Sequence, residues 1–220
     1  MRRQIFMLVL LLVSFAAPAW AQGIRDSERW RHWDFSVQTR YVGSVERDGE
    51  RGSSVSIDDD LGWGFGFGYH ANEHFTAGFL FSWRTVPYDA VVVRDDDPTE
   101  LIRYSNWLDT GTFAISADWN ILAKSFTPYV NGNLGWTMLD TNVATGYTEG
   151  YCWWDPWYGY ICDSYVSTYG TDAASYGIGA GVRWEVSRQV FLRAGYERNW
   201  VDVDNALGLD MFRLDIGLMY

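Results

Sequence analysis

The sequence has no long apolar run beyond its first residues. After residue 21 the uninterrupted apolar stretches, such as 90–93, are only a few residues long. A helix needs about 20 consecutive apolar residues to cross a bilayer. The main part of the chain is therefore predicted to contain no membrane-spanning helix.

Positive charge is also scarce. The formal net charge is −11 at pH 7, from 17 basic and 28 acidic residues. Proteins that bind nucleic acid neutralise phosphates with Lys and Arg, so this balance argues against a nucleic-acid partner. Histidine occurs only three times, which leaves few candidates for a catalytic base.

The first 21 residues have the features of a secretory signal peptide. Arg2 and Arg3 precede the apolar run 5–13, and a small-x-small exit follows. A retained anchor helix is the alternative, but the apolar run is too short to span a bilayer comfortably. We predict a signal peptide over 1–21 and an N-terminal tail over 22–33. Removal of the signal with its two arginines takes the net charge from −11 to −13.

Glycine and aromatic residues are abundant, with 22 Gly, 13 Trp, 14 Tyr and 12 Phe. Eight segments alternate between apolar and polar or small residues, with the period of two that is typical of a half-buried strand. One of them, LGWGFGFGYH, alternates aromatic residues with glycines. The segments are 34–44, 61–70, 75–84, 110–120, 128–139, 175–185, 190–198 and 212–220.

The connections between these segments alternate in length. The short ones are about 71–73, 121–126 and 186–189, and the long polar ones are about 46–60, 85–108, 140–174 and 199–210. Each segment has about ten residues, the length that a tilted strand needs to cross a bilayer. Within lipid only a helix or a closed barrel satisfies its backbone. We therefore predict one all-β domain over 34–220: a closed eight-stranded antiparallel transmembrane β-barrel with up-and-down topology, its short turns and both termini periplasmic.

The aromatic residues on the apolar faces gather at two heights along the predicted strands. The periplasmic end collects Phe35, Tyr69, Phe75, Trp119, Trp184 and Tyr220, and the outer end collects Tyr41, Trp63, Trp83, Trp136, Tyr176 and Tyr196. Two aromatic girdles with an apolar belt between them fit a bilayer. A soluble lipocalin-like barrel, with its apolar residues inside, is a poorer fit.

The opposite faces of the strands carry charges, which a barrel of this size would enclose. The predicted lumen network consists of Arg40, Arg84, Asp118, Arg183, Glu185, Arg193, Glu197, Arg213 and Asp215. The expected ion pairs are Glu197 with Arg213, Glu185 with Arg193, and Asp215 with Arg40. Because buried charges are tolerable when they are paired, we favour a salt-bridged plug. The alternative is a narrow hydrated channel, for which the glycines of 61–70 and 175–185 leave room.

An enzyme that modifies lipid would need a nucleophile and a base at the membrane surface. His70 and His74 fall at the periplasmic turn after 61–70, and His32 falls in the tail. We therefore expect no enzymatic activity, no catalytic residue and no cofactor. The acidic runs 58–60 and 95–97 offer oxygen ligands of the kind that Ca²⁺ or Mg²⁺ takes, but solvated acidic loops are the favoured interpretation, so we expect no metal centre.

The third long connection contains the stretch YCWWDPWYGYIC (151–162). Two cysteines in an exported chain predict one disulfide, Cys152–Cys162. The aromatic residues that it would enclose offer a large, rigid contact area at low entropy cost; they are Trp153, Trp154, Trp157, Tyr158 and Tyr160. We consider a recognition loop for a sugar, lipopolysaccharide or a host surface. The alternative, which we favour slightly, is a loop that packs on itself above the barrel rim.

Four pieces of the chain carry a family resemblance: DWNILAKSFTPYVNGNLGW (118–136), YGIGAGVRWEV (176–186), FLRAGYERNW (191–200) and FRLDIGLMY (212–220). In this order and spacing the chain resembles the small eight-stranded outer-membrane barrels of Gram-negative bacteria, namely the OmpA membrane domain, OmpX, OmpW and the opacity-type proteins. The resemblance implies an integral outer-membrane protein in contact with lipid and lipopolysaccharide. It also implies that the barrel-assembly machinery reads the last strand through Phe212, Leu214, Ile216, Leu218 and Tyr220.

These observations lead to a functional expectation. We expect a monomeric structural scaffold that displays outer loops for interaction with an extracellular ligand or host surface. The first alternative is a narrow, porin-like channel for small or amphipathic solutes, as in the OmpW type. The second is a lipid-modifying barrel enzyme.

Overall fold

A computed structural model describes residues 25–49, 52–93, 101–203 and 207–220. The predicted signal peptide and the acidic run 95–97 lie outside the described residues. The strands are β1 (Trp33–Val42), β2 (Val45–Asp48), β3 (Ser54–Ile57), β4 (Asp60–His70), β5 (Phe75–Val93), β6 (Leu101–Asn120), β7 (Phe126–Asp155), β8 (Gly159–Glu185), β9 (Val190–Val201) and β10 (Leu207–Met219). Among these residues, no helix is long and apolar enough to cross a membrane.

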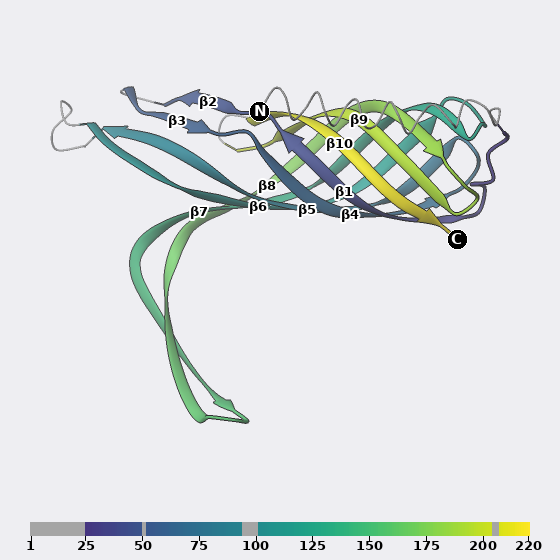
Figure 1. The fold of residues 1–220 in the computed structure, drawn as a ribbon. Coiled ribbons are helices and arrows are strands. Elements are labelled where there is room, and N and C mark those ends of the chain that lie inside the picture. The colour runs from purple at the N-terminus through teal and green to yellow at the C-terminus, as the bar shows by residue number, and fades with distance from the viewer. Residues whose placement is uncertain (1–24, 50–51, 94–100, 204–206) are drawn as a thin grey trace, which may run out of the picture.

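Eight of the strands form an antiparallel ring (Figure 1). Going round it, β1 pairs with β4, and the series continues through β5, β6, β7, β8, β9 and β10 back to β1. The predicted all-β barrel with eight ring strands is confirmed. We call the end with the connections 71–74, 121–125 and 186–189 the turn end, and the opposite end the loop end.

Side-chain hydrogen bonds hold the short connections of the turn end. The Asn72 side chain accepts hydrogen bonds from the backbone N–H groups of His74 and Phe75, both at 2.8 Å. The hydroxyl of Ser187 accepts the N–H groups of Gln189 and Val190 at 3.2 and 2.9 Å. Asn and Ser are favoured in turns because their side chains bond nearby backbone in this way. The turns therefore lie where the sequence predicted them.

The loop end differs from the prediction, because all four of the expected loops contain strand residues. In 199–210 the β9–β10 ladder continues as far as Val201 and Leu207. The stretch 85–108 continues the β5–β6 ladder as far as Val93 and Leu101. The stretch 140–174 continues β7 and β8 into a long hairpin that turns aside from the barrel (Figure 1). The stretch 46–60 holds the β2–β3 hairpin, whose second strand pairs with the extension of β5. In the β5 extension the alternation continues, with Val86, Tyr88 and Ala90 on the buried side, whereas 140–174 has no sustained alternation.

A small apolar core holds the β2–β3 hairpin against the β5–β6 extension. It consists of Ile57, Val86, Tyr88, Ala90 and Leu108. Burial of these side chains supplies the hydrophobic free energy that a short isolated hairpin lacks.

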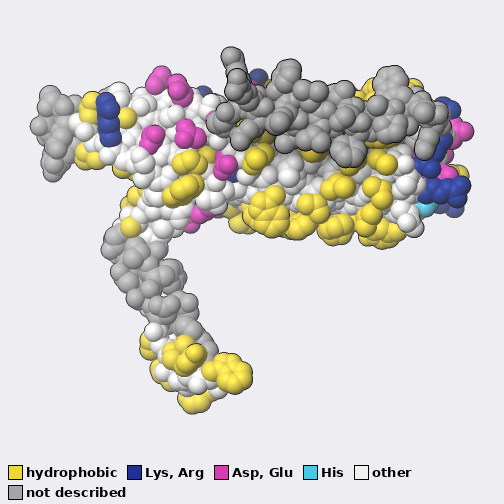
Figure 2. All heavy atoms as spheres, in the orientation of Figure 1, with side chains coloured by type: hydrophobic (Ala, Val, Ile, Leu, Met, Phe, Trp, Pro, Cys, Tyr) yellow, Lys and Arg dark blue, Asp and Glu magenta, His cyan; other side chains and the backbone are white. Residues whose placement is uncertain are grey.

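Within the ring, burial alternates residue by residue. Along β10, Met211, Arg213, Asp215, Gly217 and Met219 are buried, and the residues between them are exposed. Figure 2 shows hydrophobic side chains over the outer surface of the barrel and charged ones gathered at the turn end. The barrel is thus apolar outside and polar inside, the reverse of a soluble protein.

Candidate functional site

The lumen at the turn end is organised around Asp34 of β1. The Arg183 guanidinium donates to both carboxylate oxygens of Asp34, at 2.7 and 3.3 Å. His70 Nε2 lies 2.8 Å from the same carboxylate, and its Nδ1 lies 2.6 Å from the Thr76 hydroxyl. The Arg183 guanidinium also stacks over the Phe191 ring at 3.9 Å. A bidentate Arg–carboxylate pair fixes geometry as well as charge, so this layer is rigid.

A segment of the predicted tail lies across the turn end and places Arg29 inside it. Arg29 is 0% exposed. Its Nη1 donates to Glu185 Oε1 at 2.8 Å, and its Nη2 donates to the Leu122 carbonyl at 2.6 Å. Its Nε donates to the Glu73 carbonyl at 2.5 Å. We call residues 25–32 the cap segment, because Arg29 links the connections 71–74 and 121–125 to the end of β8 across the turn end.

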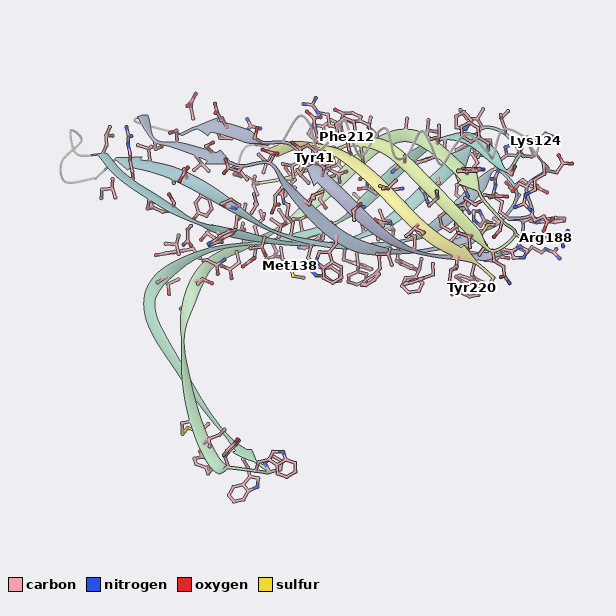
Figure 3. All side chains as sticks on the ribbon, in the orientation of Figure 1. Tyr41, Lys124, Met138, Arg188, Phe212 and Tyr220 are labelled. Carbon is pink, nitrogen blue, oxygen red and sulfur yellow. A yellow bond between two sulfur atoms is a disulfide. The ribbon has the colours of Figure 1, made fainter. Side chains whose placement is uncertain are left out.

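Backbone hydrogen bonds hold the rest of the cap segment. The Ser27 N–H donates to the Ala123 carbonyl at 3.2 Å, and the Arg31 N–H donates to the His70 carbonyl at 2.9 Å. An exposed ion pair between Lys124 and Asp26 adds to them at 2.5 Å. Figure 3 labels Lys124 and Arg188 at this end of the barrel. The sequence predicted an N-terminal tail for these residues. A single buried arginine leaves no periodic pattern, so its position could not be recognised from the sequence.

The middle of the lumen holds a chain of alternating charges. Arg193 pairs with Asp118 at 2.9 Å and with Asp215 at 3.7 Å. Arg213 pairs with Asp215 and with Glu197, both at 3.3 Å. All five side chains are buried. Asn133 donates a further hydrogen bond to Glu197 at 2.7 Å.

The observed partners agree with one predicted pair and differ for two. Glu197 and Arg213 form the expected pair. Glu185 pairs with Arg29 rather than Arg193, because the β8–β9 register sets Arg183 opposite Arg193 and the two guanidinium groups turn to different acids. Asp215 pairs with Arg193 and Arg213 rather than Arg40, since the β1–β10 register places it opposite Gln38.

The glycines on the lumen side make room for polar side chains. A Cβ at Gly177 would overlap the Asn199 amide, and one at Gly66 would lie 2.6 Å from the Gln38 amide nitrogen. The small residues of β4 and β8 thus accommodate neighbouring side chains. The channel alternative expected these glycines to leave room for water, whereas in the structure neighbouring side chains occupy that room.

Two lumen arginines, Arg40 and Arg84, stand apart from this network. Arg40 is buried and donates to Gln38 at 3.2 Å, while its Nε has no hydrogen-bond partner among the described residues. Arg84 is 9% exposed, and its Nη1 likewise has no partner there. Every residue of the predicted charge network therefore faces the lumen, but the network does not neutralise all of them.

The long hairpin carries the predicted disulfide and aromatic loop. Cys152 and Cys162 are bonded, directly opposite each other in the β7–β8 ladder. Around them Trp154 is 72% exposed and Trp157 is 88% exposed, and Tyr158 and Tyr160 are exposed as well. Figure 3 shows this tip well away from Met138, near which the hairpin leaves the barrel. The described aromatic side chains therefore do not pack above the rim, which was the favoured interpretation; the side chain of Trp153 lies outside the described set.

The predicted assembly residues share the outer face of β10. Phe212, Leu214, Ile216, Leu218 and Tyr220 are all exposed. Tyr220 lies at the turn end, and the labelled Phe212 lies toward the loop end (Figure 3). That the barrel-assembly machinery reads these residues stays a prediction.

The described acidic residues of the 58–60 run take part in local hydrogen bonds. Within the ranges that the structure describes, no group of three or more His, Cys, Asp or Glu side chains converges. Asp59 accepts a hydrogen bond from the Tyr41 hydroxyl at 2.6 Å, and Asp60 caps the N–H of Leu61 at 2.7 Å. These carboxylates serve the local structure of the rim.

The chain is similar to known outer-membrane proteins. Residues 7–220 match the family model described as outer membrane protein beta-barrel domain. No curated protein sequence matches the chain significantly. Among solved structures, the outer membrane protein OprG from Pseudomonas aeruginosa has a TM-score of 0.58 at 9% identity, covering 89% of this chain and 99% of that one. This similarity supports the fold.

Two further solved structures show weaker similarity. Neisserial surface protein A has a TM-score of 0.49 at 14% identity, covering 85% of this chain and 95% of its own. The Yersinia pestis attachment invasion locus protein Ail, in complex with the heparin analogue sucrose octasulfate, has a TM-score of 0.47 at 14% identity, with 87% and 99% covered.

Proposed function

Because the chain belongs to the outer-membrane β-barrel family and is an integral outer-membrane protein, we propose that it acts as a rigid scaffold that displays its loop end at the cell surface. The turn end and both termini then lie in the periplasm, as short turns do in this class. Lipid and lipopolysaccharide surround the monomeric barrel, and the barrel-assembly machinery inserts it through the last strand.

The observation that carries this proposal is the contrast between the two ends. The turn end is closed by Arg29, whose guanidinium is buried against Glu185 and three backbone carbonyls. The loop end extends into long hairpins, one of which presents exposed aromatic rings around a disulfide. Aromatic rings offer a large, rigid contact area at a low cost in conformational entropy, which favours them as contact residues. We propose the hairpin tip, with Trp154, Trp157 and Tyr160, as the contact surface.

The channel alternative receives less support. A barrel of eight strands is barely wide enough for its own side chains, and here these side chains form a chain of ion pairs across the lumen. A through-path would require this chain to break and the cap segment to leave.

The test compares two matched sets of substitutions. The tip variant carries Trp154→Ser, Trp157→Ser and Tyr160→Ser. The control carries Leu101→Ser, Tyr104→Ser and Trp107→Ser, which remove exposed, although less exposed, apolar residues from the β5–β6 extension. Bacteria that display each protein are tested for attachment to immobilised lipopolysaccharide and to cultured epithelial cells. We expect attachment by the wild type and the control, and its loss in the tip variant.

The same proteins, refolded in planar bilayers, are expected to show no steady conductance. Steady current that shifts with Glu197→Gln would show that the barrel acts as a channel and not as a scaffold. Equal attachment of the tip and control variants would remove the role of the hairpin tip.

A further inference from the structure

A cavity of about 60 Å³ lies inside the loop end of the barrel. Its walls are largely apolar and come from strands all round the ring. They include Val42, Leu108, Leu139, Val201 and Met211. Two charged side chains, Arg40 and Arg84, also line it. A cavity with apolar walls and a few placed charges is typical of a small-molecule site.

Arg84 reaches this cavity as a buried and incompletely paired cation. Its stem packs over Gly62, where an added Cβ would lie 3.2 Å from the Arg84 Cβ. The Nη1 group has no hydrogen-bond partner among the described residues. Asp60 acts on it electrostatically, but the two form no ion pair within the described set. A buried polar group without a partner requires an explanation, and an anion is one of the few available.

The charges of the lumen are also incompletely paired. Six buried arginines face five buried carboxylates, and the half-buried Asp60 adds a sixth acid near Arg84 without an ion pair to it among the described residues. The buried groups are Arg29, Arg40, Arg84, Arg183, Arg193 and Arg213 against Asp34, Asp118, Glu185, Glu197 and Asp215. Each of the five buried acids has an arginine within ion-pair distance, and Arg40 and Arg84 are the arginines outside those pairs. Leaving a charge buried and unpaired is strongly unfavourable, so the unpaired guanidinium of Arg84 favours an anion beside it.

The acidic residues of the nearby rim leave the Arg84 Nη1 group without a hydrogen bond in the part of the chain that the structure describes. Asp109, Asp140 and Asp172 line the adjoining cleft together with Arg84. Each is committed to another donor: Asp109 to Thr85 and Asn142, Asp140 to Thr168, and Asp172 to the Trp136 indole. Arg40, which lines the cavity, lies opposite Arg213 of the mid-lumen ion pairs in the β1–β10 ladder. The cavity therefore lies on the loop-end side of these ion pairs.

We propose that this cavity is a binding site for a small amphipathic carboxylate, with Arg84 as the partner of the carboxylate and the apolar wall in contact with a short hydrocarbon chain. The planar guanidinium fork of Arg matches a carboxylate in two parallel hydrogen bonds. The small volume selects a chain of few carbons. The site captures its ligand from the outer side and does not pass it on, so it is separate from the display of the hairpins.

Butyrate is a suitable probe, because it is too short to partition strongly into lipid. Its binding to the full chain in nanodiscs is measured by saturation-transfer NMR and titration calorimetry, beside butyramide, which has the same shape without the charge. The variants are Arg84→Met, Arg84→Lys and, as a matched control, Arg103→Met at an exposed site on β6. We expect saturable binding of butyrate and not of butyramide.

Arg84→Met should weaken butyrate binding about tenfold or more, as expected for loss of a charge-assisted hydrogen bond. Arg103→Met should leave it unchanged, and Arg84→Lys should retain part of it. Absence of saturable binding, equal binding of butyramide, or full binding by Arg84→Met would overturn the proposal. Urea unfolding of Arg84→Met gives an independent readout. Removal of an unpaired buried charge should not lower stability, whereas a large loss of stability with unchanged butyrate binding would assign Arg84 to the fold alone.

Discussion

Arg29→Met removes the charge that closes the turn end while keeping much of the side-chain volume. In the wild type the guanidinium donates to Glu185 at 2.8 Å and to the carbonyls of Glu73 and Leu122 at 2.5 and 2.6 Å. The Glu185 carboxylate keeps the Ser27 hydroxyl at 2.8 Å and Arg183 at 3.8 Å, so it is not left without partners. The main effect should therefore be weaker docking of the cap segment, not unfolding of the barrel.

The expected magnitude follows from these contacts. A hydrogen bond to a charged group contributes about 1.5–3 kcal/mol. The carbonyls can rehydrate once the segment lifts, so their loss adds little. A loss of roughly 2 kcal/mol in docking free energy corresponds to roughly a thirtyfold larger undocked population.

Hydrogen exchange of the cap segment measures this population. The amides of Ser27 and Arg31 bond across to the ring at 3.2 and 2.9 Å, so their exchange should accelerate roughly thirtyfold if opening limits exchange. Arg188→Met is the matched control, because it removes the Arg188–Glu28 pair, which is 3.2 Å long but 78% and 46% exposed. Exposed pairs contribute about 0–1 kcal/mol.

Two results would refute the reasoning. In one, Arg188→Met accelerates exchange as much as Arg29→Met does, so that burial of the guanidinium is unimportant. In the other, Arg29→Met leaves both amides protected, so that the backbone alone holds the segment.

Other predictions concern the lumen and the hairpin. Glu197→Gln should lower the unfolding free energy in urea by about 3 kcal/mol, because an arginine loses a buried partner; Arg198→Gln, which breaks a half-exposed pair, should lower it by less than about 1 kcal/mol. Cys152→Ser should leave the barrel unfolding midpoint unchanged but speed proteolysis of the hairpin tip, since the disulfide lies outside the ring; a shifted midpoint would contradict this. Gly177→Ala should destabilise the barrel by about 1–3 kcal/mol through overlap with a lumen asparagine, whereas Gly111→Ala, with open space beside it, should not.

The barrel was predictable because a bilayer imposes a strict pattern on sequence. Each spanning strand must show apolar residues to lipid and polar residues to the lumen, so segments such as 61–70 and 212–220 reveal their faces directly. The strand extensions in 85–108 and 140–174 were not predictable in this way. In 140–174 the pairing leaves no alternation in the sequence. In 85–108 the buried face packs against Ile57 of the β2–β3 hairpin, which the sequence pattern did not identify.

The lumen residues were predictable as a set, but not their partners. Inward position follows from the period of two, which holds for every member of the network. Pairing depends on register and on which way a long side chain turns, as the opposed Arg183 and Arg193 show. The burial of Arg29 and the absence of an ion pair at Arg84 depend on contacts across the ring. No local sequence pattern predicts such contacts.

The pairing of β1 with β10 makes neighbours of the two ends of the barrel sequence, with Asp34 opposite Met219. Every other ladder of the ring joins strands that lie close together along the chain, so they form at small loop-closure cost. The last ladder has a far higher contact order, and such contacts form slowly. Until it forms, both terminal strands present open edges, which favour pairing with other chains. A circular permutant that joins the ends and opens the turn at 186–189 would keep every ladder and move this seam to β8 and β9, so the position of the seam belongs to the connectivity and not to the ring.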